Sequence, residues 1–223
     1  MSAQGVLFDL DGTLVDTAPD LVAVLNGLLV ERGCVRIPYA VARNEVSNGA
    51  AGLLRLGFGD LADAAELEDL RQRFLAAYRR DVCKHSRLFI DLDDLFEQCA
   101  AFRWGIVTNK PAAFTQPLLE QLGIADLWGS VVSGDRLPQR KPDPAPLLLA
   151  ASELDVAAAD CVYVGDAPRD IEAGRAAGMI TVAAAFGYIR PSEDPSSWGA
   201  DVVIRQPREL AAVLRDLPRR NGV

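Results

Sequence analysis

The chain has 223 residues, half of them hydrophobic, which is enough for one large α/β core or for a core with a smaller insert. Its 31 acidic residues outnumber the 23 basic ones, for a formal net charge of −8, so partners such as nucleic acid or an anionic membrane are not expected. No signal-peptide pattern or long apolar span is recognisable, and the four dispersed cysteines lack a C-x-x-C pair, which together favour reduced thiols and a cytoplasmic location.

Apolar runs typical of buried parallel strands alternate with helix-period segments along most of the chain, which predicts an α/β fold with a parallel sheet. The predicted strands are residues 5–9, 103–108, 129–134, 160–166, 179–185 and 201–204. The predicted helices between and after the later strands are residues 91–101, 112–122, 144–154, 168–177 and 207–217.

The segment from Thr17 to about Arg87 differs from the rest, because its apolar residues follow a helical period and no convincing strand is present. We therefore predict an insert of about four helices between the first and second core strands. The predicted division is a core domain formed by residues 1–16 and 88–223 and a helical cap domain formed by residues 17–87.

Polar residues follow the predicted strands at the points where each strand ends. In an open α/β sheet the carboxyl ends of the strands face one crevice, so these residues are expected to converge there although they are distant in sequence. They are Asp9 and Asp11 after the first strand, Thr108 and Asn109 after the second, Asp166 and Asp170 after the fourth, and Lys141 before the helix that follows the third.

This set of residues suits the hydrolysis of a phosphate monoester. Asp9 is ionised near neutral pH, so it needs no base to act as a nucleophile, and Asp11 can protonate the leaving oxygen and later deprotonate water. Attack on a phosphate dianion requires charge neutralisation, which Mg²⁺ held by Asp9 and Asp166 would supply. The Thr108 hydroxyl and the Lys141 ammonium are expected to bind phosphoryl oxygens, and Lys141 and Mg²⁺ would balance the buried carboxylates.

Four segments of the chain resemble the four motifs of the haloacid dehalogenase-like (HAD) hydrolase superfamily, in the same order and spacing. The segments are FDLDGTLVDT, GIVTN, RKPDP and VGDAPRD. The resemblance implies a Rossmann-type parallel sheet core with an inserted helical cap domain, and a phosphatase reaction through an aspartyl-phosphate on Asp9 with Asp11 as general acid and base. It implies that Thr108, Asn109 and Lys141 bind the phosphate.

The same resemblance implies a Mg²⁺ cofactor. The expected ligands are Asp9, the backbone carbonyl of Asp11, and Asp166, with Asp170 in direct or water-mediated support. Ala167 and Pro168 depart from the commonest pattern of the fourth motif, but no catalytic carboxylate is lost.

The insert resembles the cap of the phosphoglycolate phosphatase and β-phosphoglucomutase branch, and residues 44–54 resemble a cap loop that reaches the leaving group. This implies substrate contacts from Asn48 and Gly49, and Arg43 or Arg55 could bind a substrate carboxylate. The segments RDVCKHSRLF, GYIRP and WGADVVI resemble the N-acetylmuramic acid 6-phosphate phosphatases of cell-wall recycling. The expected substrate is therefore N-acetylmuramic acid 6-phosphate or 2-phosphoglycolate.

Other functions are compatible with parts of this pattern. A β-phosphoglucomutase-like mutase would differ only in whether a sugar or water accepts the phosphoryl group from the phosphoenzyme. A receiver-like phosphorylated signalling domain is the non-enzymatic alternative, against which the helical insert and Asp11 argue, while Asp11 and Asp166 argue against a dehalogenase. The expected partner is a small phosphorylated metabolite, without nucleic acid or membrane, and the expected oligomeric state is a monomer or a homodimer.

Overall fold

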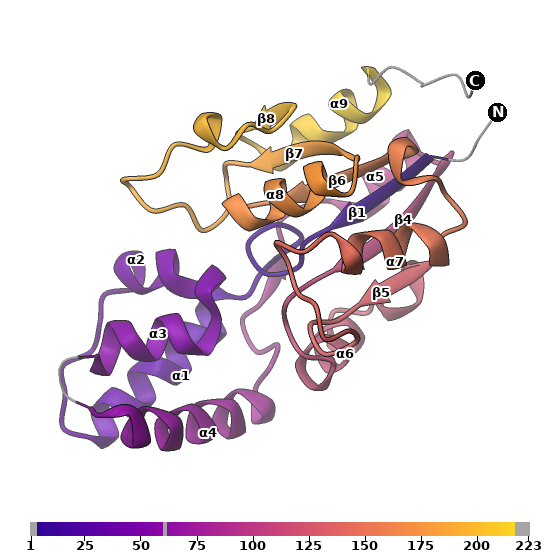
Figure 1. Ribbon diagram of the computed structural model, residues 1–223. Helices are drawn as coiled ribbons and strands as arrows, with labels where there is room; N and C mark the ends of the chain where they lie inside the picture. Colours follow the sequence, from indigo (N-terminus) through magenta and orange to yellow (C-terminus); the bar gives the residue numbers. More distant parts are fainter. Residues whose placement is uncertain (1–3, 60–61, 217–223) are drawn as a thin grey trace.

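A six-stranded parallel sheet forms the centre of the computed structural model, which describes residues 4–59 and 62–216. The strand order is β5-β4-β1-β6-β7-β8, and every ladder in this sheet is parallel (Figure 1). Each predicted strand is confirmed, with ends that agree within one or two residues. The strands are β1 (Gln4–Phe8), β4 (Phe102–Val107), β5 (Ser130–Val132), β6 (Cys161–Gly165), β7 (Ile180–Ala184) and β8 (Val202–Ile204).

Helices lie between most of the strands and after the last one, in agreement with the alternating sequence pattern. They are α5 (Leu92–Gln98), α6 (Ala112–Gln121), α7 (Ala145–Glu153), α8 (Pro168–Ala176) and α9 (Leu210–Asp216), with short 3₁₀ turns η2 (Ala125–Leu127), η3 (Ala158–Asp160), η4 (Pro195–Trp198) and η5 (Pro207–Glu209). Within the part of the chain that the structure describes, no helix combines the length and apolarity needed to cross a bilayer.

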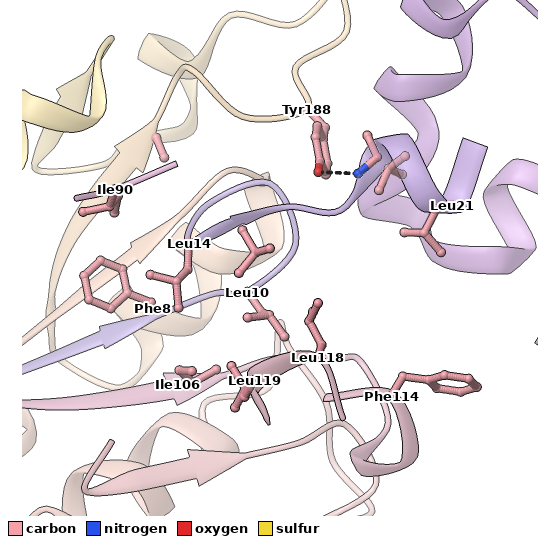
Figure 2. Close-up of a cluster of buried hydrophobic side chains, with 14 of the residues drawn as sticks. Phe8, Leu10, Leu14, Leu21, Ile90, Ile106, Phe114, Leu118, Leu119 and Tyr188 are labelled. Atoms are coloured by element: carbon pink, nitrogen blue, oxygen red, sulfur yellow. Dashed lines mark hydrogen bonds between the residues drawn. The ribbon is translucent and has the colours of Figure 1, made fainter. Parts of the chain in front are cut away.

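Hydrophobic clusters cover both faces of the sheet. Because neighbouring residues of a strand point to opposite faces, Val6 and Phe8 of β1 belong to one cluster and Leu7 belongs to the other. The larger cluster extends from Phe8 and the strands to Leu21 in the first helix of the insert (Figure 2). The buried strand β1 therefore provides a fixed support for the polar residues that follow it.

The insert after β1 is helical, as predicted. Its elements are α1 (Ala18–Glu31), α2 (Tyr39–Ala42), the 3₁₀ helix η1 (Arg43–Asn48), α3 (Gly49–Phe58) and α4 (Ala64–Arg80), and they lie together beside the core in Figure 1. Asp63 begins α4 with a capping box, because its carboxylate accepts from the Ala65 and Glu66 amides while the Glu66 carboxylate accepts from the Asp63 amide. We refer to residues 17–87 as the cap, and their independence as a domain stays a prediction.

A two-stranded antiparallel ladder that the sequence analysis did not predict joins the two crossings between core and cap. It consists of β2 (Val15–Asp16) and β3 (Arg87–Leu88). Asp20 reinforces the same crossings, since its buried carboxylate accepts hydrogen bonds from the amides of His85 and Ser86. The backbone amide of His85 therefore makes a structural contact at the end of the cap.

The loop after β7 also contacts the start of the cap. The Tyr188 hydroxyl accepts hydrogen bonds from the amides of Thr17 and Ala18, at 2.7 and 2.9 Å, and donates to the Asp16 carboxylate at 2.8 Å. Figure 2 shows the Tyr188 hydroxyl bonded to a nitrogen at the start of the cap. These bonds satisfy amides that the first turn of α1 leaves without a helical partner. The direction in which α1 leaves the core is fixed by this contact.

Candidate active site

A cavity of about 440 Å³ lies where the carboxyl ends of β1 and β4 meet the cap. The core side of its lining is mostly polar and charged, with Pro111 and Phe114 as apolar exceptions, whereas most of the cap side is apolar or small. Core residues in the lining include Asp9, Asp11, Thr108, Asn109, Lys110, Arg140, Lys141 and Arg169; cap residues include Leu21, Val46, Ser47, Asn48, Gly49, Ala50, Ala51, Arg71, Phe74, Leu75 and Tyr78. The predicted convergence of distant strand ends is therefore present.

Asp9 is fixed by the sheet and paired with a lysine. Its amide donates to the Val164 carbonyl at 2.8 Å, which continues the contact between β1 and β6 past the end of the strand. Its buried carboxylate lies 2.8 Å from the Lys141 ammonium. Burial raises the pKa of Asp9, Lys141 acts in the opposite direction, and the neighbouring Asp170 adds to the rise.

Lys141 is held in place by oxygen atoms on several sides. Its ammonium lies 2.8 Å from a carboxylate oxygen of Asp170 and donates to the Tyr163 hydroxyl at 2.7 Å and to the Val107 carbonyl at 3.0 Å. The Lys141 pKa is raised: burial alone would lower it, but the carboxylates of Asp170 and Asp9 more than compensate. A charged lysine is therefore maintained beside Asp9.

Asn109 and Thr108 lie at the end of β4, next to Lys141. The Asn109 side chain makes two hydrogen bonds to the Lys141 backbone: its nitrogen donates to the Lys141 carbonyl, and its oxygen accepts from the Lys141 backbone amide, both at 3.1 Å. In this arrangement Asn109 positions Lys141, and direct phosphate binding by Asn109 stays a prediction. The Thr108 hydroxyl lines the cavity and accepts from the Lys110 amide at 3.1 Å, which leaves its proton available to a ligand.

Asp9, Asp166 and Asp170 form a buried acidic cluster, with one carboxylate oxygen of each within 4.8 Å of the others. Burial, followed by repulsion from Asp9 and Asp170, raises the pKa of Asp166 to about 7. Such an excess of buried carboxylate charge and an all-oxygen donor set fit a hard divalent cation such as Mg²⁺. The Asp11 side chain lies outside this cluster, so only its backbone carbonyl could serve as the predicted ligand.

Gly12 allows the loop after β1 to pass against Asp166. Its φ is +93°, and a Cβ atom there would lie 2.2 Å from a carboxylate oxygen of Asp166. The Thr13 hydroxyl and the Tyr188 amide both donate to the Asp166 carboxylate, at 3.4 and 2.9 Å. A larger residue at position 12 would displace one of the predicted metal ligands.

Asp170 does more than contribute to the acidic cluster. One carboxylate oxygen contacts Lys141, and the other accepts from the Ala167 amide at 3.0 Å at the start of α8. Gly165 permits this approach, because a Cβ atom there would lie 2.3 Å from the Asp170 Cβ. Asp170 thus orients Lys141, a role compatible with indirect support of a metal.

Asp11 pairs with Lys110, a residue that the sequence analysis did not single out. The Lys110 ammonium donates to Asp11 Oδ1 at 2.8 Å and to the hydroxyl of the cap residue Tyr78 at 2.9 Å, while the Thr17 hydroxyl donates to Asp11 Oδ1 at 2.5 Å. Burial would lower the Lys110 pKa, but Asp11 and Tyr78 raise it. The Asp11 carboxylate is thus paired with Lys110, whereas Lys141 is paired with Asp9 and Asp170. Its place two residues beyond Thr108 is the signal that could have identified it.

Two further residues that sequence analysis missed join the cap to the acidic cluster. The Ser47 hydroxyl donates to an Asp166 carboxylate oxygen at 3.0 Å, and Arg169 of α8 donates to the Ser47 carbonyl at 2.8 Å. Asn48 and Gly49 follow Ser47 and line the cavity. The cap loop that includes the predicted residues Asn48 and Gly49 therefore lies over the site, and their contact with substrate stays a prediction.

Arg43 differs from its expected position. The sequence analysis named Arg43 or Arg55 as a residue that could bind a substrate carboxylate, but the Arg43 guanidinium donates to the carbonyls of Gly187 and Phe186, at 2.9 and 3.2 Å, and lies 4.8 Å from the centre of the Tyr188 ring. Neither Arg43 nor Arg55 lines the cavity described above. The two carbonyls and the aromatic ring satisfy the Arg43 side chain, which connects cap and core instead.

Comparisons with known proteins agree with this geometry. A model of a family described as haloacid dehalogenase-like hydrolase matches residues 6–184. The chain belongs to this family. The prediction of a HAD-like hydrolase, and hence of an enzyme, is confirmed.

Two curated relatives of this HAD-like hydrolase carry different names. An N-acetylmuramic acid 6-phosphate phosphatase of Pseudomonas putida is 42% identical over 216 residues, which is 96% of this chain and 97% of the relative. A phosphoglycolate phosphatase of Xanthomonas campestris pv. campestris is 46% identical over 209 residues, which is 93% of this chain and 94% of the relative. The similar identities do not decide between the two names.

A solved structure supports the fold. A crystal structure of a protein from Haemophilus somnus 129PT matches with a TM-score of 0.84 at 24% sequence identity. The match covers 96% of this chain and 99% of the chain in that structure. The predicted fold class, a Rossmann-type parallel sheet with an inserted helical cap, is confirmed.

Proposed function

We propose that this HAD-like hydrolase is a Mg²⁺-dependent phosphatase that transfers the phosphoryl group of a small monoester first to Asp9 and then to water. The observation that carries the proposal is the position of Asp9, whose carboxylate lines the cavity, pairs with Lys141 at 2.8 Å and belongs to a buried acidic cluster. An anionic nucleophile beside a lysine and a cation site suits attack on phosphate.

In the first step an Asp9 carboxylate oxygen forms a bond to phosphorus as the bond from phosphorus to the ester oxygen breaks. Asp11 donates a proton to the departing oxygen, while the Thr108 hydroxyl and Lys141 stabilise the phosphoryl oxygens. In the second step water attacks phosphorus, the Asp11 carboxylate accepts a proton from that water, and Asp9 is released as a carboxylate. Lys110 and Thr17 both donate to Oδ1 of Asp11, which keeps the Asp11 carboxyl group oriented in both steps and leaves Oδ2 to carry the transferred proton.

The acidic cluster would hold the metal. Asp9 and Asp166, with the Asp11 carbonyl, are the proposed ligands, and Asp170 supports them through Lys141. When bound, Mg²⁺ supplies positive charge that offsets the repulsion between the Asp9 carboxylate and the phosphate.

The cavity favours N-acetylmuramic acid 6-phosphate over 2-phosphoglycolate. A volume of about 440 Å³ lies within the range of roughly 300–1,000 Å³ that encloses ligands of drug size. Much of its wall is apolar, with Val46, Phe74 and Leu75 among the residues that could cover a sugar ring and its N-acetyl group. The smaller glycolate ester would leave most of this wall without a contact.

The test is a comparison of kcat/KM for phosphate release from the two esters in the presence of Mg²⁺. A preference of about a hundredfold for the amino-sugar phosphate is expected, and the reverse preference would contradict the substrate assignment. Transfer of the phosphoryl group to another sugar position without phosphate release would instead support the mutase alternative. A cytoplasmic location and a monomeric or homodimeric state also belong to this proposal.

A further inference from the structure

One face of the cap helix α4 extends along the cavity. Arg71, Phe74, Leu75 and Tyr78 all line it, at the spacing of successive helical turns. Tyr78 lies at the end near the reacting groups, because its hydroxyl contacts the Lys110 ammonium, which also contacts Asp11. Residues that come earlier in α4 on this face therefore lie further from Asp11 and the other reacting groups.

Arg71 lies at the other end of this face. It lies seven positions before Tyr78 in the chain, which corresponds to about 10 Å along the helix axis. Helical side chains lean towards the amino terminus of their helix, so the Arg71 guanidinium points away from Tyr78. Among the described cap residues that line the cavity, Arg71 is the single charged one.

The Arg71 guanidinium has donors to offer a ligand. It pairs with Glu68 of the same helix through Nε at 2.8 Å and Nη2 at 3.1 Å. A guanidinium carries five N–H donors, so this pair leaves several unused, and its planar fork suits a carboxylate. The side chain is 43% exposed, which leaves room for an anion to approach.

We infer that Arg71 binds a carboxylate of the substrate and thereby selects esters whose second anionic group lies far from the phosphorus atom. This inference rests on the proposed function and names the residue that would recognise the carboxylate of the substrate. Arg71 would be a specificity-determining residue that takes no part in the transfer itself.

The spacing separates the two candidate substrates. In 2-phosphoglycolate only the ester oxygen and one methylene carbon lie between phosphorus and the carboxyl group, a span of at most about 4 Å. In N-acetylmuramic acid 6-phosphate the connection passes through C6, the sugar ring and the lactyl ether oxygen, and it can span up to about 10 Å. From a phosphate at Asp9 the longer ester therefore extends its carboxylate much further along the cavity, in the direction of Arg71, than 2-phosphoglycolate does.

A competing site for a carboxylate lies on the core side. Arg140 is exposed, lines the same cavity and directly precedes Lys141, so it would meet a carboxylate close to the phosphate. Arg71 and Arg140 therefore correspond to long and short substrates respectively. A substitution at each position can distinguish these two geometries.

The test compares N-acetylmuramic acid 6-phosphate with N-acetylglucosamine 6-phosphate, which lacks the lactyl carboxylate. Arg71→Gln is expected to lower kcat/KM about 10- to 100-fold for the first ester and less than about twofold for the second. Arg71→Lys, which keeps the charge but not the fork, should recover part of the loss. Arg73→Gln is the matched control, because Arg73 lies on the same helix and pairs with Glu31 outside the cavity lining.

Four results would overturn the inference. An equal loss on both sugar phosphates would indicate a general effect of Arg71 on the cap, and an unchanged kcat/KM would show that it binds no carboxylate. A selective loss in Arg140→Gln instead would place the carboxylate on the core side. If the wild-type enzyme hydrolysed neither sugar phosphate but released phosphate from 2-phosphoglycolate, the proposed substrate would fail, and the role of Arg71 with it, while the phosphatase mechanism would stand.

Discussion

The ammonium of Lys110 lies 2.8 Å from an Asp11 carboxylate oxygen and forms a mostly buried ion pair with it. The same ammonium donates to the Tyr78 hydroxyl of α4 at 2.9 Å. The orientation of the proposed general acid and base is therefore connected to the position of the cap. A cap that moved away from the core would remove one of the contacts that hold Lys110.

Substitution of Lys110 tests this connection. In Lys110→Met the Asp11 carboxylate loses its charged partner, and we expect kcat to fall about 10- to 100-fold, with a smaller change in KM. Tyr78→Phe removes only the hydroxyl contact and should lower kcat a few-fold. Because p-nitrophenyl phosphate has a leaving group that needs no proton, its turnover should fall less than that of a sugar phosphate. An equal loss on both esters would argue against a role for Lys110 in orienting Asp11.

Metal binding should depend on pH through Asp166. Burial and neighbouring carboxylates raise the pKa of Asp166 to about 7, so below that pH a proton occupies the group and competes with Mg²⁺. We expect the Mg²⁺ affinity, measured by titration calorimetry, to weaken up to about tenfold for each pH unit below 7. Asp166→Asn should abolish most of the binding. An affinity that stays constant between about pH 5.5 and 7.5 would contradict this prediction.

The same shift affects the metal-free protein. Because the folded state keeps a proton on Asp166 at a pH where the unfolded chain has lost it, protonation stabilises the fold. The free energy of unfolding is therefore expected to decrease as the pH rises from about 4 to 7, and Asp166→Asn should reduce this decrease. Urea unfolding of metal-free protein at several pH values measures both.

Two glycine substitutions with opposite expected effects test the local geometry. Gly12→Ala would place a methyl group 2.2 Å from an Asp166 carboxylate oxygen at a φ of +93°, so lower stability and weaker Mg²⁺ binding are expected. Gly27→Ala lies in the exposed interior of α1 with no atom within 4 Å, and it should raise the free energy of unfolding by about 0.5–1 kcal/mol. Comparable behaviour of the two variants would be evidence against the tight loop at position 12.

Arg43 should affect all substrates alike. Arg43→Met removes the hydrogen bonds to the carbonyls of residues 186 and 187 that connect cap and core. We expect KM to rise by similar factors for sugar phosphates with and without a carboxylate. A loss of activity confined to the carboxylated ester would instead support the contact between Arg43 and the substrate that the sequence suggested.

The sequence was most informative where function depends on local order. Continuous apolar strands followed by Asp9, Thr108 and Asp166 predicted the sheet and the converging site, because a strand and the residues after it are encoded together. The pair β2 and β3 was missed, since strands of two residues have no periodic pattern.

Contacts between distant segments were the least predictable. Lys110 and Asp11 are 99 positions apart, and only the packing of β1 beside β4 brings them together. Arg71, Phe74 and Tyr78 have the spacing of an ordinary core-facing helix stripe, which by sequence alone cannot be distinguished from a cavity wall. Arg43 was placed at the substrate because its charge, but not its carbonyl partners, could be read from the sequence.

The central claim is that Asp9 carries the phosphoryl group during turnover. The most direct measurement is peptide mass spectrometry of the Asp11→Asn variant after rapid mixing with p-nitrophenyl phosphate and Mg²⁺. Since this leaving group needs no proton and the variant lacks the base that activates water, phosphoryl-enzyme should accumulate, with a burst of about one p-nitrophenol per enzyme. The account predicts one phosphoryl group on the peptide that contains Asp9, and none in the Asp9→Asn, Asp11→Asn double variant. Normal turnover by Asp9→Asn alone, or phosphoryl transfer to another residue, would contradict it.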